Sequence, residues 1–166
     1  MAGKSIHQQN YVKNVIINQR SGIMKSENSE KISKQFKFYI PKRLPGLNEI
    51  IKWSKQPIPW LSKGKKRVYQ YTIEKQQVED YIITHIYEQR GTKSIKFTHC
   101  RIHFKWIEEN KRRDPSNVCA GGRKFILDAL VKFGILTNDN WLVSEFTDEF
   151  IVNKRQAGVK VTIKGT

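Results

Sequence analysis

Asp114 lies in the stretch of this 166-residue chain whose residue types are best suited to chemistry. Lys111-Arg112-Arg113 precede it and Pro115-Ser116-Asn117 follow it. The chain has only 15 acidic residues against 31 basic ones, so a carboxylate inside a basic cluster stands out. A solvated ion pair would contribute little there. Carboxylates that converge on a positive surface are, however, also the way in which a nuclease holds Mg²⁺ against a phosphate backbone.

Two further carboxylates follow along the chain. Asp128 lies on a predicted helix one turn after Lys124, so both side chains project from the same side of it. Asp139 lies in the loop after that helix. Asp114 and Asp139 lie near opposite ends of this helix, which a rise of about 1.5 Å per residue makes about 20 Å long. They could then form one site only if the helix begins late or if a second subunit completes the site. A helix cap, an exposed i,i+4 pair and a turn are the structural alternatives for these residues.

The net charge of +16 predicts an anionic partner. There is no apolar run long enough to span a bilayer and no signal-peptide core at the start, which favours a cytoplasmic protein bound to nucleic acid and not to a membrane. Trp60 and Tyr69 either stack on unpaired bases or serve as packing residues. The side chains predicted to contact DNA phosphates are Lys63, Lys65, Lys66, Arg67, Lys111, Arg112, Arg113, Asn117 and Arg123.

The elements that must position these residues follow from hydrophobic periodicity and from Pro and Gly stops. Residues 1–35 are rich in Lys, Ser, Asn and Gln and are expected to form a flexible basic arm, with one domain over 36–166. The pattern predicts an α/β or α+β domain in which one mixed sheet is packed by helices. The predicted strands are 36–40, 94–107 and two C-terminal segments around 146–152 and 159–163, and the predicted helices are 47–55, 72–89 and 118–133.

Two local features qualify this pattern. Gly121 and Gly122, near the start of the last predicted helix, indicate either a late helix start or a close approach to another backbone. His99, Cys100 and His103 invite a zinc reading, but His99 and Cys100 point to opposite faces of an extended segment and no second ligand pair exists. Zinc is therefore not expected.

The run from Arg112 to Asp139 resembles the RusA-type Holliday-junction resolvases, small phage-associated endonucleases. Their pattern is a basic run, Asp-x-Asp-Asn, a Lys, an Asp-Ala-Leu on a helix, a Gly and a final Asp. In this chain the pattern reads Arg112-Arg113, Asp114-Pro115-Ser116-Asn117, Lys124, Asp128-Ala129-Leu130, Gly134 and Asp139. The resemblance covers this part of the chain and does not extend to residues 1–35.

The resemblance implies a phage- or prophage-encoded homodimer in the bacterial host cell. It would bind four-way DNA junctions in recombination and repair and nick two strands symmetrically with Mg²⁺, or with Mn²⁺ as an alternative. It implies that Asp114 and Asp139 bind the metal and that Lys124 supports the scissile phosphate. The apolar faces of the 95–107 strand or of the following helix are the predicted dimer contacts.

Ser116 departs from the family pattern, because it stands where the motif has its second Asp. A neutral hydroxyl is a much weaker Mg²⁺ ligand than a carboxylate. Asp128 would compensate for it, so the metal and catalytic candidates are Asp114, Ser116, Asp128 and Asp139 together with Lys124. The alternative function is a branched-DNA-binding protein of the same fold with weak or no catalytic activity.

Overall fold

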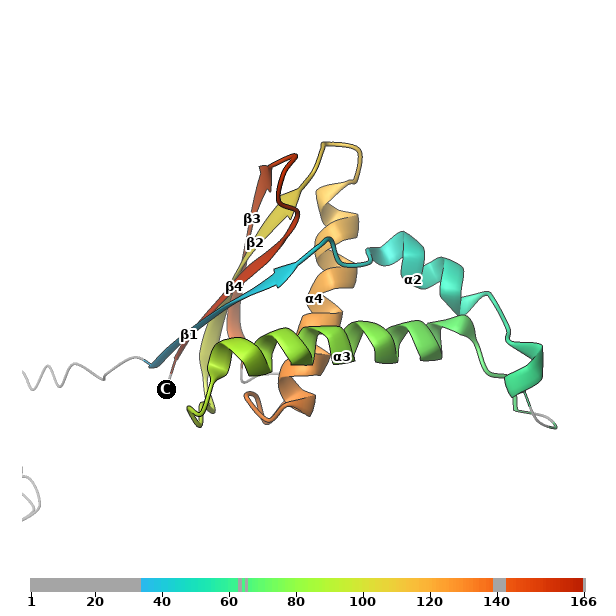
Figure 1. Ribbon diagram of the computed structural model, residues 1–166, viewed down its shortest axis with the longest axis horizontal. Helices are drawn as coiled ribbons and strands as arrows, with labels where there is room; N and C mark the ends of the chain where they lie inside the picture. The colour runs from blue at the N-terminus through green and yellow to red at the C-terminus, as the bar shows by residue number, and fades with distance from the viewer. Residues whose placement is uncertain (1–33, 63, 65, 139–142, 166) are drawn as a thin grey trace, which may run out of the picture. The chain divides into compact units, whose positions relative to one another are not determined.

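The structure is a computed structural model that describes residues 34–165, except for 63, 65 and 139–142. Its sheet consists of β1 (Lys34–Pro41), β2 (Cys100–Glu108), β3 (Val143–Val152) and β4 (Gly158–Gly165). The strand order is β1-β4-β2-β3 (Figure 1). β4 runs antiparallel to both β1 and β2, and β2 runs parallel to β3. The prediction of one mixed α+β domain is therefore confirmed, whereas the predicted arm at 1–35 lies almost wholly outside the described residues.

One face of this sheet carries the hydrophobic core. Along β2, Ile102, Phe104 and Trp106 are buried, while Arg101, His103 and Lys105 alternate with them toward the opposite face. β1 and β4 show the same alternation of apolar and polar positions. Such a pattern is typical of a sheet that packs against helices on one side and meets solvent on the other. The strand begins at Cys100, later than the predicted 94, and its pairing with β3 is irregular between Cys100 and Arg101.

The helices α3 (Gln70–Arg90) and α4 (Pro115–Lys132) pack with this apolar face, and α2 (Leu47–Ser54) packs against α3 and α4. A short 3₁₀ helix, η1, spans Pro59–Leu61. Buried residues of α3 and α4 join the apolar strand residues in one cluster, among them Ile82, Ile86, Phe125, Ile126 and Leu130. The apolar faces of β2 and α4 are therefore covered within the chain, which contradicts their predicted role as dimer contacts. None of the helices in the described part is long and apolar enough to cross a membrane.

The two glycines of α4 explain how α2 comes to lie beside it. α4 begins at Pro115, so the alternative of a late start is wrong. A Cβ atom added to Gly121 would lie 2.5 Å from the backbone carbon of Gly46, and one added to Gly122 would lie 2.7 Å from the Trp106 ring. The close approach to another backbone is therefore the correct reading. It brings the segment that leads into α2 against the first turns of α4.

Candidate nucleic-acid interface

Asp114 is the N-cap residue of α4. Its Oδ1 atom accepts hydrogen bonds from the Ser116 backbone N at 2.7 Å and from Ser116 Oγ at 2.5 Å. These two hydrogen bonds hold the pKa of the Asp114 carboxyl below its usual range, and the bond from the Ser116 hydroxyl has the larger effect. The positive end of the α4 dipole favours the same anionic form. Asp114 is therefore an ionised, exposed carboxylate at neutral pH.

A surface hollow of about 410 Å³ surrounds this carboxylate. We call it the Asp114 hollow. The turn before α2 and α2 itself form one wall, and the loop before α4 with its first turn forms the other. Four cations and two carboxylates line it, which leaves a positive excess. Its lining residues are Arg43, Asn48, Glu49, Lys52, Arg112, Arg113, Asp114 and Asn117.

Two of the predicted DNA contacts hold the walls of this hollow together. Arg113 pairs with Glu108 at 3.3 Å and donates to the Leu44 carbonyl at 3.0 Å, and its side chain is only 11% exposed. The Asn117 Oδ1 atom accepts from the Asn48 backbone N at 2.8 Å, which links α4 to the first turn of α2. Both side chains are thus engaged inside the protein, and Arg112 and Lys111 are the exposed cations of this loop.

Arg43 and Lys52 are members of the Asp114 hollow that the sequence did not identify. Arg43 pairs with Glu49 at 3.5 Å, and Lys52 is exposed on α2. They lie more than sixty residues before Asp114, so no local spacing connects them to it. Gly121 was the one indication in the sequence that another backbone segment lies against this helix. The sequence could not show that this segment contains Gly46, just before α2.

Asp128 lies away from the Asp114 hollow. Its Oδ2 atom is 2.8 Å from Lys75 Nζ on α3 and 3.3 Å from Lys124 Nζ, and its side chain is only 17% exposed. The hydrogen bond with Asp128 is the main reason why the pKa of Lys75 is raised. Fourteen residues of helix separate Asp128 from Asp114, about 20 Å. Lys124 and Asp128 share one side of α4 as predicted, but the structure does not bring either of them to Asp114.

This position makes a structural role for Asp128 testable. Asp128→Asn removes the charge that Lys75 faces across the α3–α4 contact, and we expect the free energy of unfolding to fall by about 1–2 kcal/mol, between the values of exposed and buried pairs. Urea unfolding measures this. Asp80→Asn, at an exposed carboxylate that pairs with Lys132 at 3.0 Å, is the matched control and is expected to change little. Unchanged stability with lost DNA cleavage would instead favour a catalytic role for Asp128.

Arg123 is also engaged within the protein. It pairs with Asp148 of β3 and lies over the rings of Phe104 and Phe146, with 5.8 and 5.1 Å from its Cζ atom to the centroids. Asp148 additionally accepts from Trp106 Nε1 at 2.8 Å. Arg123 therefore holds the edge of the sheet to α4. Of the predicted DNA contacts, Lys66, Arg67, Lys111 and Arg112 are exposed, while Lys63 and Lys65 lie outside the described residues.

Asp139 also lies outside the described residues, but the chain on either side of it is described. Leu136 forms a bridge with Phe97, and Val143 pairs with Cys100, so both flanks lie where β2 begins. Asp114 follows the other end of β2, and α4 between them has 18 residues, about 27 Å in length. Within 34–165, apart from the gaps, no group of three or more His, Cys, Asp and Glu could hold a metal ion.

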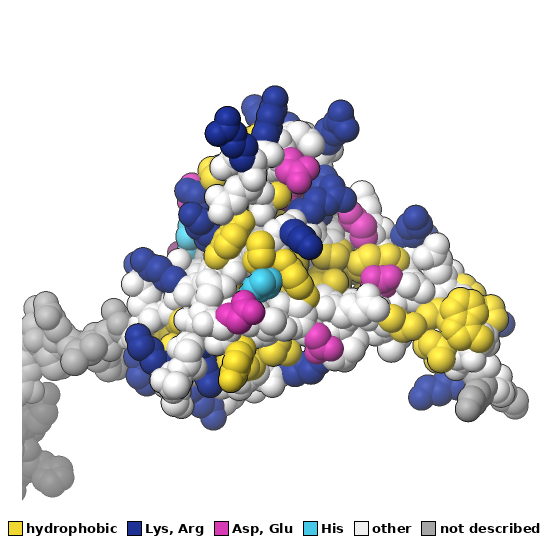
Figure 2. Space-filling view, in the orientation of Figure 1, with side chains coloured by type: hydrophobic (Ala, Val, Ile, Leu, Met, Phe, Trp, Pro, Cys, Tyr) yellow, Lys and Arg dark blue, Asp and Glu magenta, His cyan; other side chains and the backbone are white. Residues whose placement is uncertain are grey.

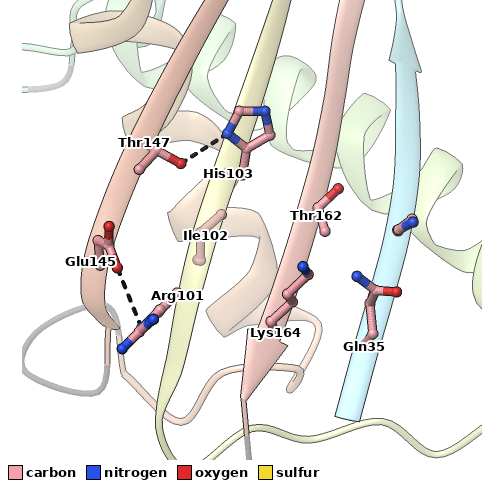
Figure 3. A pocket seen from close by; sticks show the side chains of 9 residues that line it. Gln35, Arg101, Ile102, His103, Glu145, Thr147, Thr162 and Lys164 are labelled. Carbon is pink, nitrogen blue, oxygen red and sulfur yellow. Dashed lines mark hydrogen bonds and ion pairs between the residues drawn. The ribbon is translucent and has the colours of Figure 1, made fainter. Parts of the chain in front are cut away.

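A second hollow lies on the open face of the sheet (Figure 3). Four of its side chains contact one another in two pairs: Arg101 pairs with Glu145 at 3.3 Å, and His103 Nδ1 lies 2.8 Å from Thr147 Oγ1. Gln35, Lys37, Thr162 and Lys164 line it from β1 and β4. In this hollow the carboxylate of Glu145 is paired with Arg101, whereas the Asp114 carboxylate of the other hollow accepts its hydrogen bonds from Ser116.

The Asp114 hollow is thus the candidate site: an ionised carboxylate at a helix start, bordered by cations from two segments distant in sequence. Comparison with models of known protein families gives no match, and comparison with curated proteins gives none either.

Proposed function

We propose that this protein is a structure-selective endodeoxyribonuclease of the RusA type, which binds four-way DNA junctions as a homodimer and nicks two strands with Mg²⁺. The observation that supports this proposal is the Asp114 hollow, because it combines an ionised carboxylate with a surplus of cations. The ordered motif from Arg112 to Asp139 adds the resemblance to these nucleases.

The cations of the hollow have a defined task in this proposal. Arg112 and Lys52 are exposed and would neutralise backbone phosphates, with release of counterions. Arg43 already pairs with Glu49, which would position its guanidinium at the rim. The N-terminus of α4 favours an anion at the same place. These groups would place one phosphate next to the Asp114 carboxylate.

The donor set fits Mg²⁺ in part. Mg²⁺ is often bound by only one or two protein carboxylates together with waters and substrate phosphates. Asp114 fits as one such carboxylate, and Asp139 is the second in this proposal. Because the flanks of Asp139 lie at the far end of α4 from Asp114, a site that uses both would form between two subunits. The bound metal would activate water and stabilise the charge that develops on the scissile phosphate.

Ser116 favours a second candidate function, a branched-DNA-binding protein that cuts weakly or not at all. Its hydroxyl donates to Asp114 at 2.5 Å, so this position already serves the helix cap. The described residues also hold no group of three potential metal ligands. DNA binding is common to both candidates, and cleavage separates them.

The first test is binding to four-way, Y-shaped and linear DNA of equal length, with and without Mg²⁺. We expect tighter binding to the branched forms and a steep fall with salt. If Arg43, Lys52, Lys111 and Arg112 each contact one phosphate, log K should fall with log[salt] by about 0.9 per contact. Raising the salt from 50 to 200 mM would then weaken binding about 100-fold. Fluorescence anisotropy measures both effects, and product gels in the Mg²⁺ samples report cleavage.

Lys52→Gln is the matched probe of the hollow, and Lys96→Gln, outside the hollow, is its control. The first substitution should lower the salt slope by about 1 and the second should leave it unchanged. Equal affinity for junction and linear duplex across the salt series would count against the proposed function. Light scattering that shows a monomer both with and without DNA would refute the homodimer.

A further inference from the structure

Trp60 is the most exposed large hydrophobic side chain among the described residues, at 81%. A tryptophan ring is normally buried for most of its area, because its removal from water is strongly favourable. The sequence left open whether Trp60 packs or stacks on a ligand. Within the described chain it does not pack, so its surface is free for a partner.

The segment that carries Trp60 is held by a set of internal hydrogen bonds. Ile58 is buried, and its backbone N donates to the Val68 carbonyl at 2.7 Å. The Ser62 hydroxyl donates to the Ile58 carbonyl at 2.7 Å and accepts from the Val68 N at 3.0 Å. Pro59 opens the 3₁₀ helix η1 that contains Trp60. The ring is therefore presented on an ordered support, so that little conformational freedom is lost on binding.

The charge around Trp60 points to the class of partner. Residues 55–69 contain five basic and no acidic residues. Lys66 and Arg67 are exposed on the segment between η1 and α3. Figure 2 shows hydrophobic side chains gathered at the end of the described part where Figure 1 places η1, with Lys and Arg beside them. A second copy of this chain would bring a net charge of +16 against this cationic segment, whereas nucleic acid offers phosphates and flat base faces together.

We infer that Trp60 stacks on an unstacked base at the branch point of the DNA, while Lys66 and Arg67 contact the neighbouring phosphates. This inference rests on the proposed function and deepens it, because it gives a reason for selecting branched DNA. In a linear duplex each base already stacks on its neighbours, so Trp60 finds no free base face. Every base has such a face, so stacking gives structure selectivity without sequence preference.

The test is a double-mutant cycle between the ring and the base. Wild type and Trp60→Ala are each titrated with a four-way junction, with the same junction carrying abasic sites at its branch point, and with linear duplex. We expect Trp60→Ala to weaken binding to the intact junction about tenfold, within the range for loss of one stacked base. Binding to the abasic junction and to the duplex should change less than about twofold. Trp60→Phe should retain most of the affinity.

Tyr87→Ala is the matched control, because Tyr87 is an aromatic residue that is 64% exposed and lies on α3. It should leave all three affinities unchanged. A wild type without preference for the junction would overturn the proposed function and this inference with it. A preference that survives in Trp60→Ala would overturn the inference alone, as would an equal loss on the intact and the abasic junction. A change from dimer to monomer in Trp60→Ala would assign Trp60 to a subunit contact and likewise overturn it.

Discussion

Asp114→Asn is expected to abolish cleavage of a four-way junction in Mg²⁺, with a loss of more than about 100-fold, because even the outer-shell partners of metal ligands change activity by about 10–100-fold. Asn is as good an N-cap residue as Asp, and its Oδ1 atom can still accept from the Ser116 N. The fold should therefore persist. Binding should be unchanged or tighter, since a negative charge leaves a surface that faces phosphate.

Single-turnover cleavage and metal-free binding, measured on the same preparation, check this expectation. The pKa of Asp114 is lowered, so its charge persists as the pH falls toward the usual Asp range, and the defect is expected at every pH from about 5 to 8. Glu109→Gln, an exposed carboxylate in the same basic loop, is the matched control for the charge change. Asp139→Asn should reproduce the defect. Cleavage that survives both Asp114→Asn and Asp139→Asn would show that the site assignment is wrong.

Ser116→Asp is expected to raise cleavage or Mg²⁺ affinity by about tenfold or more, because it adds an anionic oxygen ligand beside Asp114. The new carboxylate would lie in the first turn of α4, where the helix dipole favours negative charge. Two adjacent carboxylates repel each other in the absence of metal. Mg²⁺ should therefore raise the melting temperature of Ser116→Asp more than that of wild type.

Ser116→Asn is the neutral control of similar size and should show neither gain. The melting-temperature shift does not depend on turnover, so it reports metal binding even in a protein that does not cut. A wild type that never cleaves, together with a Ser116→Asp variant that does, would mean that this chain is a disabled resolvase. An absence of any Mg²⁺ effect in Ser116→Asp would remove position 116 from the metal site.

Several features of the fold were predictable because they depend on neighbours in the chain. The alternation of Ile102, Phe104 and Trp106 with charged residues has the period of a strand, and the structure buries those three side chains on one face. Gly134 marked the end of α4 and adopts a φ of 78° just after it. Lys124 and Asp128 share one side of that helix because they are four residues apart.

The start of α4 was missed for a physical reason. Asp114 followed by Pro115 is a strong N-terminal signal, but Gly121 and Gly122 made an early helix look unfavourable. In the structure both glycines lie where a larger side chain would meet Gly46 or Trp106. The packing of α4 onto α2 and β2 outweighs the low helix propensity of glycine, and only the tertiary structure contains that packing.

The amino-acid sequence alone thus determined that the protein is a basic, mixed α+β domain with Asp114 in a basic loop at the start of a helix. Composition gives the charge, and the periodicity of apolar residues gives the helices and strands. The partners of its charges were decided by the tertiary structure. Arg113, Arg123 and Asp128 looked equivalent to the exposed charges, yet they pair with Glu108, Asp148 and Lys75. Except for Glu108, these partners lie on elements distant in sequence. The exposure of Trp60 was likewise decided by the tertiary structure. Trp60 lies in a loop without hydrophobic periodicity, so its contacts depend on how distant segments fold around it.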